Sequence, residues 1–164
     1  MAIMTYKRGD KTPLTENFLR KEFDCKCGKC NTKHDPELSH KLQIMREHFG
    51  KSIIITSGYR CLVHNANVGG ASKSYHTLGM AADIIVVDVN TSEVCKFAES
   101  IGFYGIGIYD DGYVHVDTRP KECKAFWRNH EQIPIETFGA VEAPEVSAKQ
   151  LASEIREVLK KYGY

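Results

Sequence analysis

The sequence predicts an α+β fold with a small, mostly antiparallel sheet and helices on one side of that sheet. Two observations lead to this class. Apolar runs of strand length occur between stretches with a helical period, and two of these runs are joined by a hairpin turn. The chain has 164 residues, 42% of them hydrophobic, which predicts one compact domain with a short appendage.

The first predicted helix is marked at both ends. Asp35 and Pro36 supply an N-cap and a proline at the first helical position, and Gly50 suits the end of the helix. Between these ends the apolar residues recur at helical spacing: Leu38, Leu42, Met45 and Phe49. We expect a short helix or turn within residues 14–23 and a buried strand over residues 52–56.

The rest of the predicted domain contains one long loop, two further β segments and a second helix. Residues 57–74 are rich in glycine, asparagine and serine without periodicity, which predicts a functional loop. A strand is expected over 82–87 and a helix over 90–101. Strands over 105–109 and 113–118 flank Asp110-Asp111-Gly112, and Asp-Gly between β-rich runs indicates a hairpin.

A change of character after residue 124 divides the chain. Residues 1–124 are expected to form the domain, and residues 125–146 a linker or arm, because they contain prolines and few periodic apolar positions. Residues 147–164 predict an amphipathic helix. We expect this helix to pack on its own domain, with docking onto a partner as the alternative.

Charge and hydropathy restrict the partners that the chain can have. The formal net charge is +1, so no overall field favours nucleic acid or an anionic membrane. The N-terminus lacks the apolar run of a signal peptide, and no segment is long and apolar enough to span a bilayer. We therefore expect cytoplasmic synthesis without a signal peptide.

Two imidazoles and a carboxylate occur in a pattern that suits zinc. His76 and Asp83 lie seven residues apart, across Gly79, which permits a tight bend. Antiparallel pairing of strand 113–118 with strand 82–87 would put His115 beside Asp83. Three protein ligands with one open position are typical of catalytic zinc. Each residue alone has an ordinary alternative, such as a packed histidine or a turn aspartate.

A hydrolytic zinc site also needs a proton acceptor and a group that contacts the substrate. Asp110, Asp111 and Asp117 are candidates for the acceptor, and Asp117 is alternatively a residue that orients a metal ligand. Arg60 offers paired donors for a substrate carboxylate or an oxyanion. The alternative for Arg60 is anchoring of its loop.

Six cysteines are present, and three of them lie close together in the sequence as Cys25, Cys27 and Cys30. This spacing is consistent with a second, structural metal site, with Cys61 or His34 as the fourth ligand. It is also consistent with a redox-sensitive cluster that forms disulfides. Reduced, partly buried thiols are the simpler alternative.

Taken together, these motifs resemble the zinc peptidases of the D-alanyl-D-alanine carboxypeptidase family M15, in a group that shares its fold with the hedgehog signalling domain. The family pattern S-x-H-x-x-G-x-A-x-D is matched at every fixed position over residues 74–83. The S-G-Y-R motif is matched over residues 57–60, and H-x-D by His115 and Asp117. The resemblance covers roughly residues 14–120.

The resemblance implies hydrolysis of D-Ala-containing or cross-link peptide bonds in the peptidoglycan of the bacterial cell wall. It implies Zn²⁺ held by His76, Asp83 and His115, with Arg60 contacting the substrate. Many members carry the catalytic acid three residues before the last ligand, where this chain has Gly112. Asp111 is therefore the first choice for this role by proximity, and Asp117 the second.

The branch that the chain resembles occurs in bacteria and their phages. A phage lysin that reaches the wall after phage-mediated release is therefore one expectation. The alternatives are a non-catalytic, zinc-stabilised module that binds the cell wall or a protein, and a structural phage component attached through its C-terminal helix. The non-catalytic module is favoured by one feature of the sequence, which is Gly112 at the position where many family members carry the catalytic acid.

Overall fold

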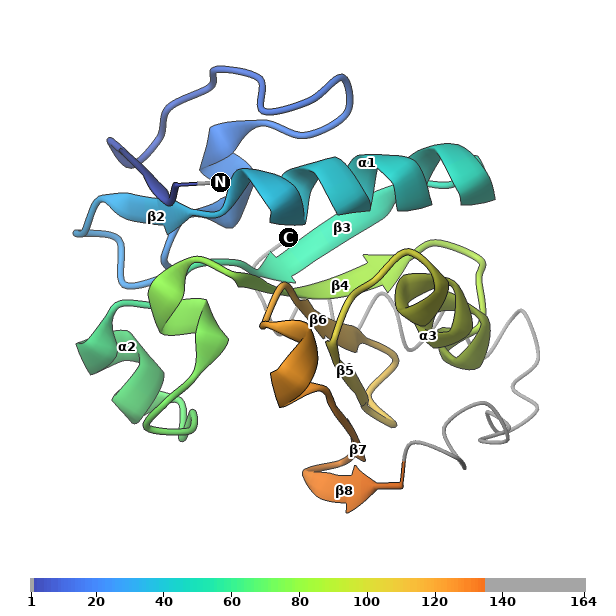
Figure 1. Ribbon diagram of the computed structural model, residues 1–164. Helices are drawn as coiled ribbons and strands as arrows, with labels where there is room; N and C mark the ends of the chain where they lie inside the picture. The colour runs from blue at the N-terminus through green and yellow to red at the C-terminus, as the bar shows by residue number, and fades with distance from the viewer. Residues whose placement is uncertain (1, 135–164) are drawn as a thin grey trace.

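A computed structural model describes residues 2–134 and confirms the α+β class (Figure 1). The predicted C-terminal helix and residues 135–146 of the predicted linker lie outside the described residues. Within the described part of the chain, no helix has the length and apolar character that crossing a membrane requires.

The described residues contain three α-helices, three short 3-10 helices and two sheets. The α-helices are α1 (Pro36–Phe49), α2 (Leu62–Asn67) and α3 (Thr91–Ser100), and the 3-10 helices are η1 (Arg20–Phe23), η2 (Tyr75–Leu78) and η3 (Lys121–Cys123). The strands are β1 (Met4–Tyr6), β2 (Thr32–His34), β3 (Ile53–Ser57), β4 (Ala81–Val86), β5 (Gly105–Ile108), β6 (Val114–Asp117), β7 (Ala125–Arg128) and β8 (Glu131–Ile133).

The main sheet has six strands in the order β3-β4-β6-β5-β7-β8, and β1 pairs separately with β2. Every neighbouring pair in the main sheet is antiparallel except β5 and β7, which run parallel. The sheet is therefore mixed, and it is larger than the small sheet that the sequence predicts.

Both long helices begin with the side-chain caps that their sequences provide. The Asp35 carboxylate accepts a hydrogen bond from the backbone N–H of Glu37 at 3.1 Å, and Gly50 ends α1 with φ +59°. Asn90 caps α3 by accepting from the backbone N–H of Ser92 at 2.8 Å. These two helices lie within about a residue of their predicted bounds.

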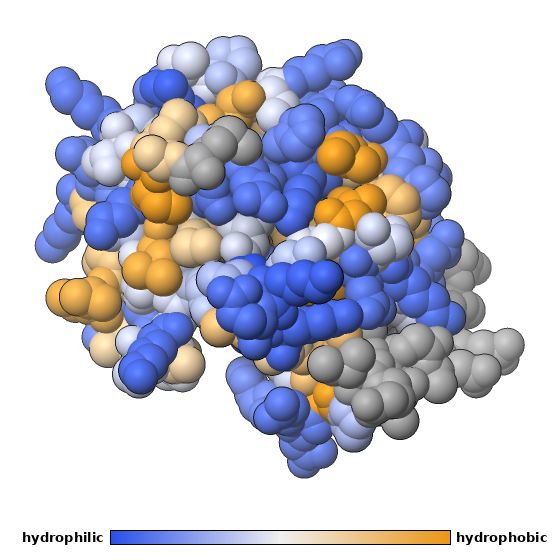
Figure 2. Space-filling view, in the orientation of Figure 1, coloured by the Kyte–Doolittle hydropathy of each residue, from blue (hydrophilic) through white to orange (hydrophobic). Residues whose placement is uncertain are grey.

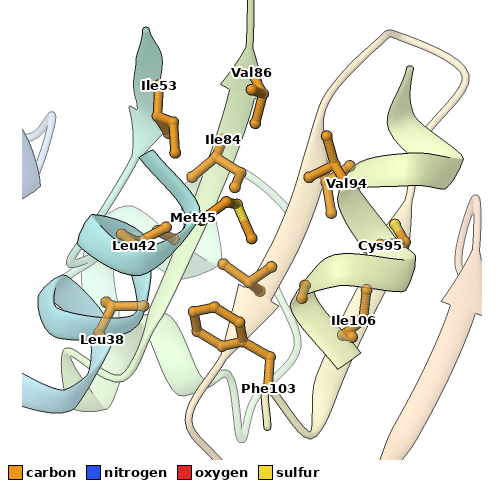
Figure 3. Packing of buried hydrophobic residues seen from close by; sticks show 14 of the residues in the cluster. Leu38, Leu42, Met45, Ile53, Ile84, Val86, Val94, Cys95, Phe103 and Ile106 are labelled. Atoms are coloured by element: carbon orange, nitrogen blue, oxygen red, sulfur yellow. The ribbon is translucent and has the colours of Figure 1, made fainter. Parts of the chain in front are cut away.

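The core lies between these helices and one face of the main sheet. Figure 3 shows side chains of α1 and α3 meeting side chains of β3, β4 and β5. The labelled members are Leu38, Leu42, Met45, Ile53, Ile84, Val86, Val94, Cys95, Phe103 and Ile106. Successive strand residues point to opposite faces. The residues between these apolar positions, Asp83 among them, therefore point away from the two helices.

Residues 57–74 do not form the continuous loop that the sequence predicts, because they contain α2. The Cys61 side chain caps this helix by accepting from the backbone N–H of His64. A helix of less than two turns shows no helical period in its sequence, which is why the pattern did not reveal it. Leu62 and Val63 are exposed, and Figure 2 shows apolar side chains over this part of the surface.

The start of the predicted linker also differs from expectation. Residues 125–128 form β7 against β5, and residues 131–133 form β8 against β7. Phe126 is fully buried, so this segment adds to the core of the domain. The parallel partner of β7 lies about twenty residues earlier in the chain, and no local turn signal marks such a pairing.

Candidate metal centre

Three side chains converge on one point of the sheet face that lies opposite α1 and α3. His76 Nε2 lies 3.2 Å from Asp83 Oδ1 and 3.2 Å from His115 Nδ1, and these last two atoms are 2.9 Å apart. All three residues are buried. The predicted zinc ligands are therefore brought together.

The strand register explains why Asp83 and His115 meet. Asp83 of β4 pairs directly with His115 of β6, which confirms the antiparallel pairing that the sequence predicts. Opposed residues on one face of an antiparallel pair have Cβ atoms about 5 Å apart, so two polar side chains reach one another.

His76 reaches the same point from η2, which ends at Gly79. Gly79 has φ +77°, and a Cβ atom at this position would overlap the carbonyl group of Lys33. Glycine is therefore required here both for the left-handed backbone and for the close approach of β2. The bend turns the chain from η2 into β4, where Asp83 follows.

The donor set fits a zinc ion. Two imidazole nitrogens and one carboxylate oxygen are typical of catalytic zinc sites with an open fourth position. Zinc–ligand bonds of about 2.0–2.1 Å in a tetrahedron place the ligand atoms roughly 3.3 Å apart. The observed separations of 2.9–3.2 Å come close to one face of that tetrahedron.

Hydrogen bonds on the far side of each imidazole hold the rings in place. His76 Nδ1 lies 2.7 Å from the carbonyl oxygen of Gly58, and His115 Nε2 lies 3.1 Å from Asp117 Oδ2. Nitrogens that donate to these acceptors leave His76 Nε2 and His115 Nδ1 as lone-pair donors for a metal. Arg119 donates to both oxygens of Asp117, at 2.8 and 2.7 Å.

The charges of the centre favour an ionised Asp83. Burial raises the pKa of Asp83, but the charges and hydrogen bonds of His76 and His115 outweigh burial and hold this pKa well below its usual range. Burial lowers the pKa of His76. Burial also acts to lower the pKa of His115, but the hydrogen bonds with Asp117 and Asp83 raise it to about 9. This raised pKa means that His115 carries a proton on both ring nitrogens at neutral pH. A cation bound at Nδ1 would take the place of the proton that faces Asp83.

Arg60 contacts the outer oxygen of Asp83 through Nη2, and its Nε donates to Ser57 Oγ at 2.9 Å. Its backbone N–H donates to the carbonyl of His76 at 3.1 Å. Arg60 therefore anchors its loop to an acidic residue, as one of its two predicted roles requires. Its side chain also lines the cleft above the centre.

This cleft has a volume of about 860 Å³. Aromatic side chains form much of its wall, including Tyr75, Tyr109, Tyr113 and Trp127. His64 and His130 also line the cleft.

The candidate proton acceptors occupy different places. Asp117 is fully buried and lines the cleft beside His115. Asp110 and Asp111 are exposed in the β5–β6 turn and are not part of the described cleft lining. Asp110 forms an ion pair with Arg128 at 2.8 Å. The turn therefore does not bring either aspartate to the centre.

Two residues of the cleft, Arg119 and Trp127, are not predicted from the sequence. Arg119 holds Asp117, and its guanidinium lies 4.7 Å from the ring centroid of Tyr75. The Trp127 ring lies 5.0 Å from the ring of His115. The alternation His115, Asp117, Arg119 is a signal that could have identified Arg119. Trp127 gave no such signal, because it lies on the unexpected strand β7.

Two glycines of β5 leave room for these side chains. A Cβ atom at Gly105 would overlap the Asp117 carboxylate, and one at Gly107 would overlap the Trp127 indole. Glycine at these positions therefore lets both side chains lie flat over the strand.

Comparison with known proteins gives related sequences. The sequence is similar to the peptidoglycan L,D-endopeptidase MepK of Escherichia coli K12, with 35% identity over 94 residues, which cover 52% of each chain. It is also similar to the zinc D-Ala-D-Ala carboxypeptidase of Streptomyces albus G, with 41% identity over 64 residues, 38% of this chain and 25% of that protein. A probable MepK of Haemophilus influenzae is 34% identical over 97 residues, 54% of this chain and 52% of that protein.

The chain spans about half the length of the MepK relatives that it matches. The model of the family described as peptidase M15 matches residues 16–117, which is more than half of this chain and includes all three convergent side chains. The chain therefore belongs to the peptidase M15 family.

Proposed function

We propose that this protein is a zinc-dependent peptidase that cleaves D-Ala-containing or cross-link peptide bonds of peptidoglycan. The observation that carries the proposal is the convergence of His76 Nε2, Asp83 Oδ1 and His115 Nδ1 at the floor of a large cleft. Relatives named as a peptidoglycan endopeptidase and a zinc carboxypeptidase support the substrate class and the metal. The overall fold is proposed to be that of the hedgehog and DD-peptidase group.

His76, Asp83 and His115 would hold the zinc ion, and Asp117 and Gly58 would keep the two imidazoles in the required orientation. Bound zinc supplies Lewis acidity, which lowers the pKa of water to about 7 and polarises a carbonyl group. Arg119 neutralises Asp117, so that the carboxylate can stay buried and ionised next to His115.

Two aspartates are proposed for proton transfer, and their positions rank them. Asp117 lines the cleft, with its Oδ2 on the side of His115 away from the ligand atom Nδ1, whereas Asp111 lies in the exposed turn. Among the described residues of the lining, Asp117 is the carboxylate that does not belong to the ligand set. We therefore place Asp117 first and Asp111 second. Asp117 also orients His115, so its substitution affects both metal and turnover.

Arg60 is proposed to contact the substrate. Its guanidinium lines the cleft and touches only one oxygen of Asp83, Oδ2, while Oδ1 faces the imidazoles. A guanidinium carries five N–H donors. Arg60 can therefore keep its contacts with Asp83 and Ser57 and still donate to a peptide carboxylate or carbonyl oxygen.

Digestion of purified peptidoglycan tests the function. Muropeptides from treated walls, separated and weighed by mass spectrometry, are expected to show loss of terminal D-Ala or separation of cross-linked stems. The two products distinguish a carboxypeptidase from an endopeptidase. Chelation should abolish the change, and added zinc should restore it.

His76→Ala is the matched control, because it removes one ligand from the cleft. Unchanged muropeptides with zinc-loaded wild-type protein would contradict the proposal and favour the non-catalytic module that binds wall or protein. Retained lytic activity in His76→Ala protein would contradict the role of the cleft. The site of action is proposed to be the cell wall, with phage-mediated release and attachment through residues 147–164 as further predictions.

A further inference from the structure

Four thiols gather at a second place, separate from the three convergent side chains of the cleft centre. Cys25, Cys27 and Cys30 follow η1, and Cys61 stands at the start of α2. Their four Sγ atoms all lie within 4.8 Å of one another. We propose that these cysteines bind a structural zinc ion through four thiolates.

The sulfur geometry fits this ion. Zinc–sulfur bonds of about 2.3 Å in a tetrahedron place the sulfur atoms roughly 3.8 Å apart, which agrees with the observed grouping. Zinc sites with four cysteines are closed, with no position for water, and they stabilise folds rather than catalyse. Soft thiolate ligands also favour zinc over magnesium or calcium.

Backbone N–H groups point at three of the four sulfurs. Cys25 Sγ accepts from the N–H of Cys61 at 3.3 Å, Cys27 Sγ from Lys29 at 3.5 Å, and Cys61 Sγ from His64 at 3.5 Å. Donors of this kind stabilise the negative charge of metal-bound thiolates and fix their direction. The cysteine loop and the start of α2 therefore both direct backbone N–H groups at the sulfurs.

Two alternatives fit less well. Cys27 Sγ and Cys30 Sγ are 3.3 Å apart and free, farther than the roughly 2.05 Å of a disulfide bond. A single disulfide would also join only two thiols of the group and leave the other two unbonded. His34, the other candidate for the fourth ligand, is fully buried and contacts Ser39 Oγ through Nε2 at 3.0 Å, outside the sulfur group.

The site would connect the N-terminal segment to the loop that carries Arg60. Cys61 follows Arg60 directly, and the N–H of Tyr59 donates to the carbonyl of Phe23 at 2.9 Å. A Cβ atom at Gly58 would come within 2.6 Å of Phe23 Cα, so the two segments are in close contact. Gly58 in turn accepts from His76. A zinc ion here would hold the wall of the cleft in place.

Metal content and spectroscopy test the proposal without any measurement of activity. Protein purified with reductant and loaded with zinc is expected to hold one zinc ion per chain more than Cys27→Ser or Cys30→Ser protein. Cys95→Ser and Cys123→Ser are matched controls outside the group and should keep full zinc content. His76→Ala should lose the other ion and keep this one.

Wild-type protein provides the deciding measurement should the serine variants fail to fold. Cobalt-substituted protein is expected to show thiolate-to-cobalt charge-transfer absorption, and zinc should protect four thiols from a thiol reagent. Cobalt spectra without that absorption, equal reactivity of the four thiols with and without zinc, or a disulfide found under reductant would overturn the proposal. Failure to hydrolyse peptidoglycan has no bearing on these readouts.

Discussion

Asp83 lies directly opposite His115 in the β4–β6 ladder, with Asp83 Oδ1 2.9 Å from His115 Nδ1. The pair is positioned by backbone hydrogen bonds, so a metal centre built on it does not depend on a mobile loop. Loss of either side chain should therefore remove the metal while the sheet remains. We expect Asp83→Ala and His115→Ala to lose one zinc ion per chain and at least about 1,000-fold in kcat/KM.

The measurement is elemental analysis of purified variants beside muropeptide turnover. Val114→Ala, also in β6 but facing the core, is the control, and it should lower stability while keeping the zinc. Full zinc content in both ligand variants would show that the ion binds elsewhere.

Asp117 and Asp111 should differ when each is replaced by asparagine. Asp117→Asn is expected to lower zinc affinity about 10–100-fold, because Asp117 orients His115. At saturating zinc it should still lower kcat by about 100-fold or more. Asp111→Asn, in the exposed turn, should stay within about threefold of wild type. Lost turnover with retained zinc in Asp111→Asn protein would identify Asp111 as the proton acceptor instead.

Gly79 should be far less tolerant of substitution than another left-handed glycine. Gly79→Ala adds a Cβ atom that overlaps the Lys33 carbonyl at φ +77°, whereas Gly9 has the same φ and nothing within 4 Å. Gly9→Ala should cost about 1–2 kcal/mol in free energy of unfolding. Gly79→Ala should cost about 1–3 kcal/mol more. Denaturant unfolding measures both changes in free energy. Equal losses of stability in the two variants would mean that β2 moves to make room for the new methyl group.

His34 should make the protein less stable as the pH falls. Burial and the charge of Arg20 lower the pKa of His34 to about 4, from 6.5 in an unfolded chain. Between these values the unfolded state binds more protons, so the stability due to neutral His34 is complete above about pH 6.5 and is lost toward pH 4. The loss amounts to about 3 kcal/mol.

His34→Gln removes this titration and should flatten the dependence of unfolding free energy on pH between 4 and 6.5. His40, on the exposed side of α1, provides the control through His40→Gln, which should keep the slope of wild type. An unchanged slope in His34→Gln protein would show that other groups cause the acid sensitivity.

Trp127 should report metal binding by its fluorescence. It is the single tryptophan of the chain, and its ring lies 5.0 Å from that of His115. Zinc added to metal-free protein should change the emission with a one-site curve, because His115 loses its proton on binding. His115→Ala should abolish this response. An identical response in that variant would assign the signal to another site.

The sequence by itself determined the class of the fold, the ends of both long helices and the hairpin. These features depend on local rules: the Asp35-Pro36 start and Gly50 end of α1, and the Asp-Gly turn before β6. It also identified the three convergent side chains of the metal centre, because strand alternation and one antiparallel pairing are enough to place His115 beside Asp83.

Tertiary structure alone decided the features that depend on distant pairings. The parallel β5–β7 contact brings Trp127 into the cleft, and no local pattern encodes it. The grouping of Cys61 with Cys25 depends on the fold of a segment 36 residues away. The hairpin turn leaves Asp111 exposed while β6 buries Asp117. Proximity in sequence favoured Asp111, whereas the fold places Asp117 in the cleft lining, because side-chain direction and burial, rather than separation along the chain, decide which groups meet.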